Sequence, residues 1–154
     1  MADIETLIQG SQKLIDIFGY WPSFHDAEII ELHIWRGDVD PEQKRYVFPL
    51  LTVQLHTWEL TNEVDERGFF ILRNHTLTKI RFHDVNDFKM EKFNHQNAIL
   101  ELQIEQKERI DGPSPFFVVE FTPAFGMSAT FSCFRIEVLE ALRCEKDGKV
   151  HGQH

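Results

Sequence analysis

Apolar and polar side chains alternate with a period of two along most of the chain after residue 27. The alternation is clearest at 30–34, 51–55 and 98–107, where apolar residues share one parity and polar residues the other. This period predicts strands with one buried and one solvated face. Short turns such as Gly112-Pro113-Ser114-Pro115 join these segments, whereas parallel strands would need crossovers of about a dozen residues or more. The chain is therefore predicted to form an antiparallel sheet.

Further extended segments are predicted at 69–73, 77–85, 116–121 and 127–138, which brings the sheet to six or seven strands. The tripeptide Asn74-His75-Thr76 is interpreted as a bend between two of them. Five basic or imidazole side chains share one parity in this region: Arg73, His75, Lys79, Arg81 and His83. We interpret them as a solvated sheet face that pairs with Glu side chains on a neighbouring strand.

Residues 3–18 follow a helical period instead. Apolar residues recur at spacings of three and four from Ile4 to Phe18, on one side of an amphipathic helix. Asp3 is placed to cap this helix and Gly19 to end it, although Gly10 costs about 1 kcal/mol of helix propensity relative to alanine. We expect an α+β fold, mainly β, whose N-terminal helix packs on a curved antiparallel sheet of six or seven strands, either a half-barrel or a folded-over sheet.

The chain has 154 residues, enough for one domain with its own core. We expect 1–144 to form that domain, with strands from about residue 27 onward, and the polar segment 145–154 to be a flexible tail. A secretory signal and an apolar run of membrane-spanning length are both absent from the sequence, so a cytoplasmic protein is expected. Cys133 and Cys144 are predicted to stay reduced, with Cys133 as a small buried residue.

The charge balance and the lack of known motifs narrow the functional classes. Sixteen Lys and Arg against 25 Asp and Glu give a formal net charge of −9. Nucleic-acid binding depends on clustered Lys and Arg, so this charge argues against a nucleic-acid partner. The sequence contains no dinucleotide-binding, P-loop or Gly-x-Ser-x-Gly motif. No cofactor is therefore predicted.

Eight histidines raise the question of a metal site, because imidazole is a common metal ligand. His25, Asp26 and Glu28 form one compact group where a turn enters a strand. Strand parity puts His25 on the opposite side from the two carboxylates, and no standard ligand spacing occurs. We favour the interpretation that His25 and Asp26 hydrogen-bond to the backbone and fix the turn after Pro22. The alternative is a small metal-dependent or acid–base enzyme that uses all three residues.

The segment Phe18-Gly19-Tyr20-Trp21-Pro22-Ser23-Phe24-His25-Asp26-Ala27-Glu28-Ile29 resembles family fifty of the bacterial immunity proteins of polymorphic toxin systems. Less specific similarity covers 55–59, 77–85, 93–97 and 126–133, so the resemblance spans most of the chain. It implies a non-enzymatic, cytosolic protein that binds and neutralises a cognate toxin, usually encoded beside it. It brings no catalytic residues.

Within this motif, Trp21, Pro22, Phe24, His25 and Asp26 are interpreted as architecture. A large residue before proline is pushed into an extended conformation, which ends the helix. The rings of Trp21 and Phe24 are then expected to close one end of the core, while His25 and Asp26 clamp the turn.

Two charged loops, 37–44 and 61–68, are the candidates for the toxin-binding surface, because exposed loops carry specificity. Their acidic residues are Asp38, Asp40 and Glu42 in the first loop, and Glu63, Asp65 and Glu66 in the second. Toxin domains that attack nucleic acid carry basic clefts, so a basic, nuclease-like domain is the expected partner. An interaction or ligand-binding domain with no link to toxins is a further alternative.

Overall fold

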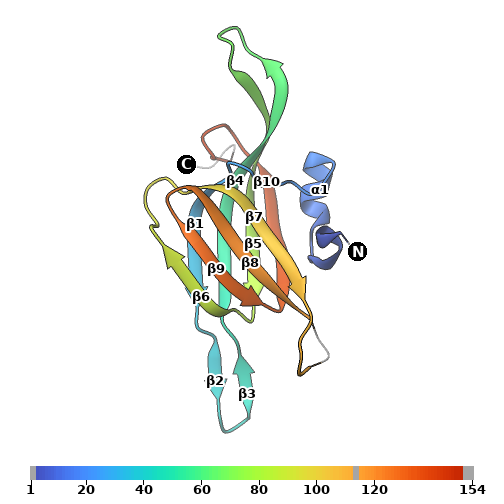
Figure 1. Ribbon diagram of the computed structural model, residues 1–154, viewed down its shortest axis with the longest axis vertical. Coiled ribbons are helices and arrows are strands. Elements are labelled where there is room, and N and C mark those ends of the chain that lie inside the picture. Colours follow the sequence, from blue (N-terminus) through green and yellow to red (C-terminus); the bar gives the residue numbers. More distant parts are fainter. Residues whose placement is uncertain (1–2, 113–114, 151–154) are drawn as a thin grey trace.

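The computed structural model describes residues 3–112 and 115–150, most of which lie in strands (Figure 1). One sheet has eight strands in the order β10-β5-β4-β1-β7-β8-β9-β6, and β2 and β3 form a separate hairpin. Neighbouring strands are antiparallel, as the short turns predict. The strands are β1 Glu28–Trp35, β2 Asp38–Asp40, β3 Arg45–Val47, β4 Leu50–Val64, β5 Phe70–His83, β6 Asn86–Glu91, β7 Ala98–Lys107, β8 Phe116–Phe125, β9 Ser128–Cys133 and β10 Arg135–Arg143.

The mainly β architecture is confirmed, but the prediction of six or seven strands is wrong. The expected bend at 74–76 is absent, because β5 continues through it with Asn74 in a left-handed conformation (φ 55°). The segment predicted at 127–138 is divided between β9 and β10 at Phe134. β6 was not predicted, although Phe88 and Met90 alternate there with polar residues.

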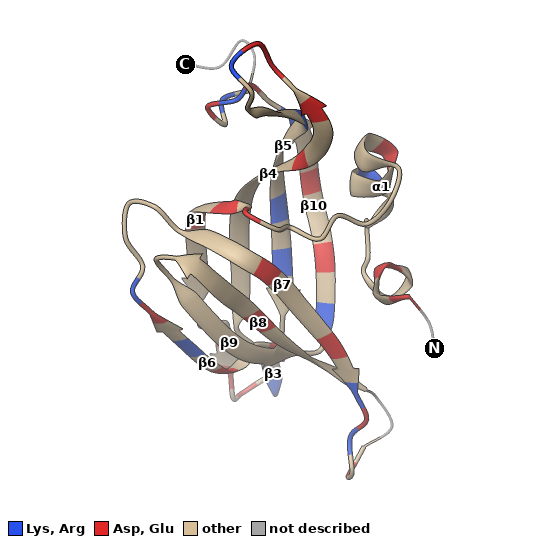
Figure 2. Cartoon of the chain, turned by 45° about the horizontal axis from the view of Figure 1, so that its top comes forward, with Lys and Arg blue, Asp and Glu red and all other residues tan. Residues whose placement is uncertain are grey.

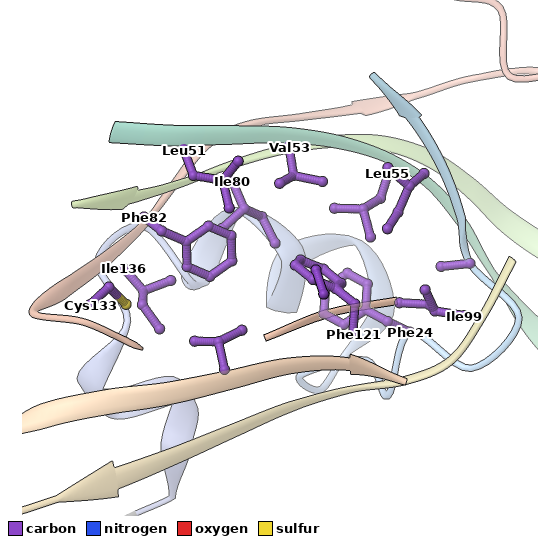
Figure 3. Packing of buried hydrophobic residues seen from close by; sticks show 14 of the residues in the cluster. Phe24, Leu51, Val53, Leu55, Ile80, Phe82, Ile99, Phe121, Cys133 and Ile136 are labelled. Carbon is purple, nitrogen blue, oxygen red and sulfur yellow. The ribbon is translucent and has the colours of Figure 1, made fainter. Parts of the chain in front are cut away.

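The sheet folds over, so that β10, β5 and β4 face β7, β8 and β9 across one hydrophobic core (Figure 3). Phe82 of β5 packs edge-on against Phe131 of β9 and Phe121 of β8, with ring centroids 4.9 and 6.1 Å apart. Cys133 is buried in this core as predicted, and burial raises the pKa of its thiol to about 12. Cys133 is therefore a protonated, packed thiol at neutral pH. The β4 and β5 residues of the core are Leu51, Val53, Leu55, Ile80 and Phe82.

The single helix predicted over 3–18 is broken into a 3-10 helix, η1 (Ile4–Leu7), and α1 (Gln12–Phe18). Between them Gln9 pairs with β10: its N–H donates to the carbonyl of Ile136 at 2.9 Å, and its carbonyl accepts from Val138 N–H at 2.7 Å. Gly10 then turns the chain at φ +74°. The N–H and carbonyl of Gln9 are both bonded to β10 and are not available for helical hydrogen bonds, so α1 begins only at Gln12. Neither helix in the described ranges is long and apolar enough to cross a membrane.

The ends of this N-terminal segment differ from each other in how they are capped. Gly19 ends α1 as predicted, in the left-handed region at φ 83°, with its N–H bonded to the Ile15 carbonyl at 2.7 Å. Asp3 makes no side-chain capping hydrogen bond, so that part of the prediction is wrong. Leu14 and Phe18 of α1 are buried in the common core, and α1 packs beside β10 at one edge of the sheet (Figure 1).

The outer face of β5 carries the predicted basic stripe, which is paired with acidic residues of β10. Lys79 lies 3.9 Å from Glu140, and His83 lies 3.1 Å from Glu137. Arg81 donates to the Thr52 hydroxyl of β4 at 3.1 Å. In Figure 2 the basic bands of β5 run next to the acidic bands of β10. The predicted pairing with Glu side chains is confirmed for Arg73, Lys79 and His83. It is wrong for Arg81, and for His75, which meets His56 instead.

Candidate functional site

The segment after α1 turns sharply before it enters β1. Phe24 and Asp26 both adopt left-handed conformations, with φ of 60° and 65°. The turn is tied to β7, because Asp26 N–H donates to the Ile99 carbonyl at 2.8 Å, and it is closed by Ala27 N–H bonded to the Phe24 carbonyl at 3.0 Å. Such backbone conformations are rare for residues other than glycine, so the surrounding hydrogen bonds must hold them in place.

The two aromatic rings of the motif lie in contact but in different surroundings. Trp21 and Phe24 meet edge to face with centroids 5.5 Å apart. Phe24 is 2% exposed and belongs to the core, and Pro22 is buried beside it. Trp21 is only half-buried, and its open surface lines a groove on the outside of the fold. Phe24 is therefore a core residue, while Trp21 spans the core and the groove.

His25 and Asp26 lie on the same side, contrary to the expectation from strand parity. Their side chains approach to 3.1 Å, because the left-handed conformation of Asp26 makes this a turn and not a strand. Their relative exposures are 59% and 53%, so water reaches both groups. Both line the groove, as does Glu28. Within the described part of the chain, no three His, Cys, Asp or Glu side chains are grouped so as to hold a metal ion.

The groove is an open cavity of about 1050 Å³ between segments that are distant in the sequence. It is bounded by residues 20–26, by the outer parts of β4 and β5, and by β7. Its aromatic and aliphatic lining includes Tyr20, Trp21, Trp58, Leu60 and Leu72, and its carboxylates are Asp26, Glu28, Glu59 and Glu101. Among the described residues that line it there is no Lys or Arg. The groove is therefore apolar and acidic at the same time.

A hydrogen bond fixes one side of the groove. The Tyr20 hydroxyl donates to a carboxylate oxygen of Glu59 at 2.5 Å, which joins the segment after α1 to β4. This hydrogen bond, with burial and the negative charge of Glu59, raises the pKa of Tyr20 above its usual value. Tyr20 therefore remains a neutral donor at physiological pH.

Two histidines that are separate in the sequence meet beside Trp58, one of the residues that line the groove. His56 Nε2 and His75 Nδ1 lie 3.1 Å apart, and Trp58 packs against both rings at 5.0 and 5.9 Å. Burial is the main cause that lowers the pKa of each imidazole; the positive charge of the neighbouring His75 adds to it for His56. A turn in the segment 145–150 lies against His56, closed by Gly148 N–H bonded to the Glu145 carbonyl at 2.9 Å. The residues 151–154, also expected to be flexible, lie outside the described residues.

The two predicted binding loops are hairpin ends and not irregular loops. Residues 37–44 include β2 and its turn, and residues 61–68 include the end of β4 and its turn into β5. Asp40 and Asp65 use their carboxylates to accept backbone N–H groups of these turns, and Glu63 is paired with Arg73. The hairpins project from opposite ends of the molecule (Figure 1). The structure therefore does not bring the two acidic groups into one surface.

Sequence reasoning missed the groove, although part of its signal was visible. Trp58 and Glu59 lie in the segment 55–59, whose similarity to the family is less specific than that of the motif after residue 18. Glu101 lies on the polar side of β7, where a carboxylate is expected to be solvated. Only the fold brings these residues next to Tyr20 and Trp21.

Comparison with known proteins gives one match. The family model described as Immunity protein 50 matches residues 10–142. This range contains the turn at 24–27 and every strand that borders the groove. No curated protein and no solved structure matches the chain.

Proposed function

The chain belongs to the immunity protein 50 family, and from this premise we propose that it is a non-enzymatic protein that binds and neutralises a cognate bacterial toxin domain in the cytoplasm. The family match over residues 10–142 is the observation that carries the proposal.

The net charge of −9 supports a basic partner, such as a nuclease-like toxin domain. Opposite charges steer two proteins together over a Debye length of about 8 Å at physiological salt. Glu42 at the β2–β3 turn and Glu66 at the β4–β5 turn are exposed and have no ion-pair partner among the described residues. At most one hairpin end is expected to face the toxin, because the two lie at opposite ends of the molecule.

Association kinetics with the toxin domain encoded beside this gene test the proposal. The association rate should fall as salt rises, while the dissociation rate changes little, because charges at the rim of an interface act mainly on encounter. Two neutralised variants locate the steering charges: D38N/D40N/E42Q and E63Q/D65N/E66Q. Asparagine keeps an acceptor oxygen at positions 40 and 65, where the carboxylates hold turns.

The outcomes separate steering from binding itself. Salt-independent association with both variants equal to wild type would refute the steering argument. No detectable binding to that toxin domain at micromolar concentration would refute the inhibitor function for this pair.

A further inference from the structure

One edge of β7 is left without a partner strand. β1 pairs with β7 only at Glu28 and Ala98, and the neighbouring backbone bonds on this side end at Ile99. In the described ranges, residues 101–107 form strand pairs with β8 alone. Alternate backbone N–H and C=O groups of this segment therefore point away from the sheet, where another strand can pair with them.

The two outer edges of the sheet, on β10 and β6, are protected. Where the sheet folds over, β1 after Ile29 and β7 at 101–107 are each paired on one side only, and of these two edges the one on β7 borders the groove. On β10, Gln9 occupies backbone groups near Ile136, and α1 packs alongside. β6 is six residues long, contains the left-handed residue Asp87 (φ 55°), and pairs irregularly with β9. Short, irregular or covered edges are the usual means by which proteins avoid unwanted strand pairing. The register shifts of β7 lie between Ala98 and Glu101, and η1 contacts the strand, but from Glu101 to Lys107 β7 pairs in regular register with β8 and its free edge borders the groove.

The lining of the groove selects for a cation with apolar neighbours. Tyr20, Trp21 and Trp58 offer aromatic faces, which attract the guanidinium of Arg and the ammonium of Lys. Glu59 and Glu101 add negative charge on opposite sides of the groove. No Lys or Arg lines it in the described part of the chain, and among its carboxylates Asp26 is the one that lies at ion-pair distance from an imidazole, 3.1 Å from His25. Tyr, Trp and Arg are also the residues that dominate the binding energy of protein interfaces.

The β4–β5 hairpin extends this surface. Leu60 and Leu72 line the groove, and Val64, Phe69 and Phe70 continue along the hairpin with exposures of 56%, 64% and 58%. A continuous exposed apolar surface of this kind marks an interaction site. The β2–β3 hairpin lies at the other end of the molecule and does not adjoin the groove (Figure 1).

We propose that this groove is the toxin-binding site, and that it accepts an extended segment of the toxin containing Arg or Lys, which adds as a strand to the free edge of β7. The inference rests on the proposed function and names the surface that performs it. Backbone pairing with residues 101–107 supplies affinity, while the aromatic and acidic lining selects the basic side chains of the segment.

A second copy of this chain fits the groove less well than a basic segment. Antiparallel pairing of two β7 edges would bring Glu101 and Glu105 close to the same residues of the other copy. Like charges opposite each other destabilise a strand pair. The acidic strand therefore opposes self-association and leaves its edge to a cationic partner.

Hydrogen–deuterium exchange on the full chain, alone and with the toxin domain encoded beside this gene, tests the site directly. Alternate amides within 101–107 should exchange at least about 10-fold more slowly in the complex, because they gain hydrogen bonds. Exchange in the β2–β3 hairpin should not change. Protection at the β2–β3 hairpin, with none in β7, would overturn the groove as the site.

A charge-reversal pair tests the lining. The variant E59K/E101K should weaken toxin binding about 100-fold or more. Reversal of a charge inside an interface both slows association and speeds dissociation of the complex. The control E91K/E108K makes the same change in net charge at exposed sites outside the groove, and should reduce affinity only a few-fold. Circular dichroism of both variants checks that they are folded.

The outcomes distinguish the site from the function. Wild-type affinity of a folded E59K/E101K variant would refute the groove while leaving the inhibitor function intact. Protection of β7 that rises with the concentration of the isolated chain would instead identify the edge as a dimer interface and overturn the proposal. If the wild-type chain does not bind the toxin domain, the proposed function is refuted, and with it the inference that the groove is the toxin-binding site.

Discussion

Phe24→Ala should cause a large loss of stability, because this ring fills the core at the turn between α1 and β1. The side chain is 2% exposed, and truncation of a fully buried phenylalanine costs about 3–5 kcal/mol. A domain of this size loses about 2–4 °C of melting temperature per kcal/mol. The melting temperature of Phe24→Ala should therefore fall by about 6–20 °C.

Trp21→Ala should cost less, about 2–3 kcal/mol, because the ring is half-buried and loses one edge-to-face contact with Phe24. Phe125→Ala is the matched control: this phenylalanine is 62% exposed, so its truncation should change the free energy of unfolding by less than about 1 kcal/mol. The order Phe24, Trp21, Phe125 follows from burial alone.

Thermal and urea unfolding followed by circular dichroism measure these differences. The reasoning is refuted if Phe24→Ala melts within a degree or two of wild type, or if Phe125→Ala is as destabilising as Phe24→Ala. Trp21→Ala should also weaken toxin binding beyond its effect on folding, since part of the ring lines the groove.

Three further predictions follow from local geometry. Burial lowers the pKa of His56 and His75 in the folded state. Below about pH 6.5, the ordinary pKa of histidine, the unfolded state therefore binds more protons than the folded state. The free energy of unfolding should be full above that pH and should fall as the pH drops toward the folded pKa values. Urea unfolding between pH 5 and 8 should show this loss, and a His56→Gln/His75→Gln variant with the same pH slope would contradict it. Untagged protein should contain substoichiometric zinc, manganese and iron by elemental analysis. One equivalent of metal that is lost in His25→Ala would favour the alternative of a metal-dependent enzyme that uses His25, Asp26 and Glu28. Gly10→Ala should destabilise the protein more than Gly19→Ala in thermal melts, because a Cβ at Gly10 would meet the Val138 carbonyl oxygen at 2.5 Å, whereas nothing lies within 4 Å at Gly19; equal losses would argue against that clash.

Much of the fold was predictable, because the alternation of apolar and polar residues along a strand indicates which of its faces is buried. β7 was predicted with its bounds and β8 with its first residue, although β8 runs to Phe125 and not to residue 121; each strand buries one face in the common core. The helix boundary was not predictable, because Gln9 leaves the helix to pair with β10, more than a hundred residues further along the chain. The continuity of β5 was also missed, since the left-handed conformation of Asn74 absorbs the irregularity without ending the strand.

The candidate site was less predictable than the fold. The motif at 21–26 was recognised, but strand parity separated His25 from Asp26, whereas the turn brings them together. The groove combines residues from α1 to β7 whose relation depends on how the sheet folds over. A sequence pattern specifies which face of a strand is buried, but not which distant segments border its edge.

The most direct test of the central claim is the activity of the toxin domain encoded beside this gene, measured while the purified chain is titrated into it. The proposed inhibitor should abolish that activity at one molar equivalent of wild-type chain, and the E59K/E101K variant should require a large excess. Full toxin activity in the presence of several equivalents of folded wild-type chain would contradict the proposed function.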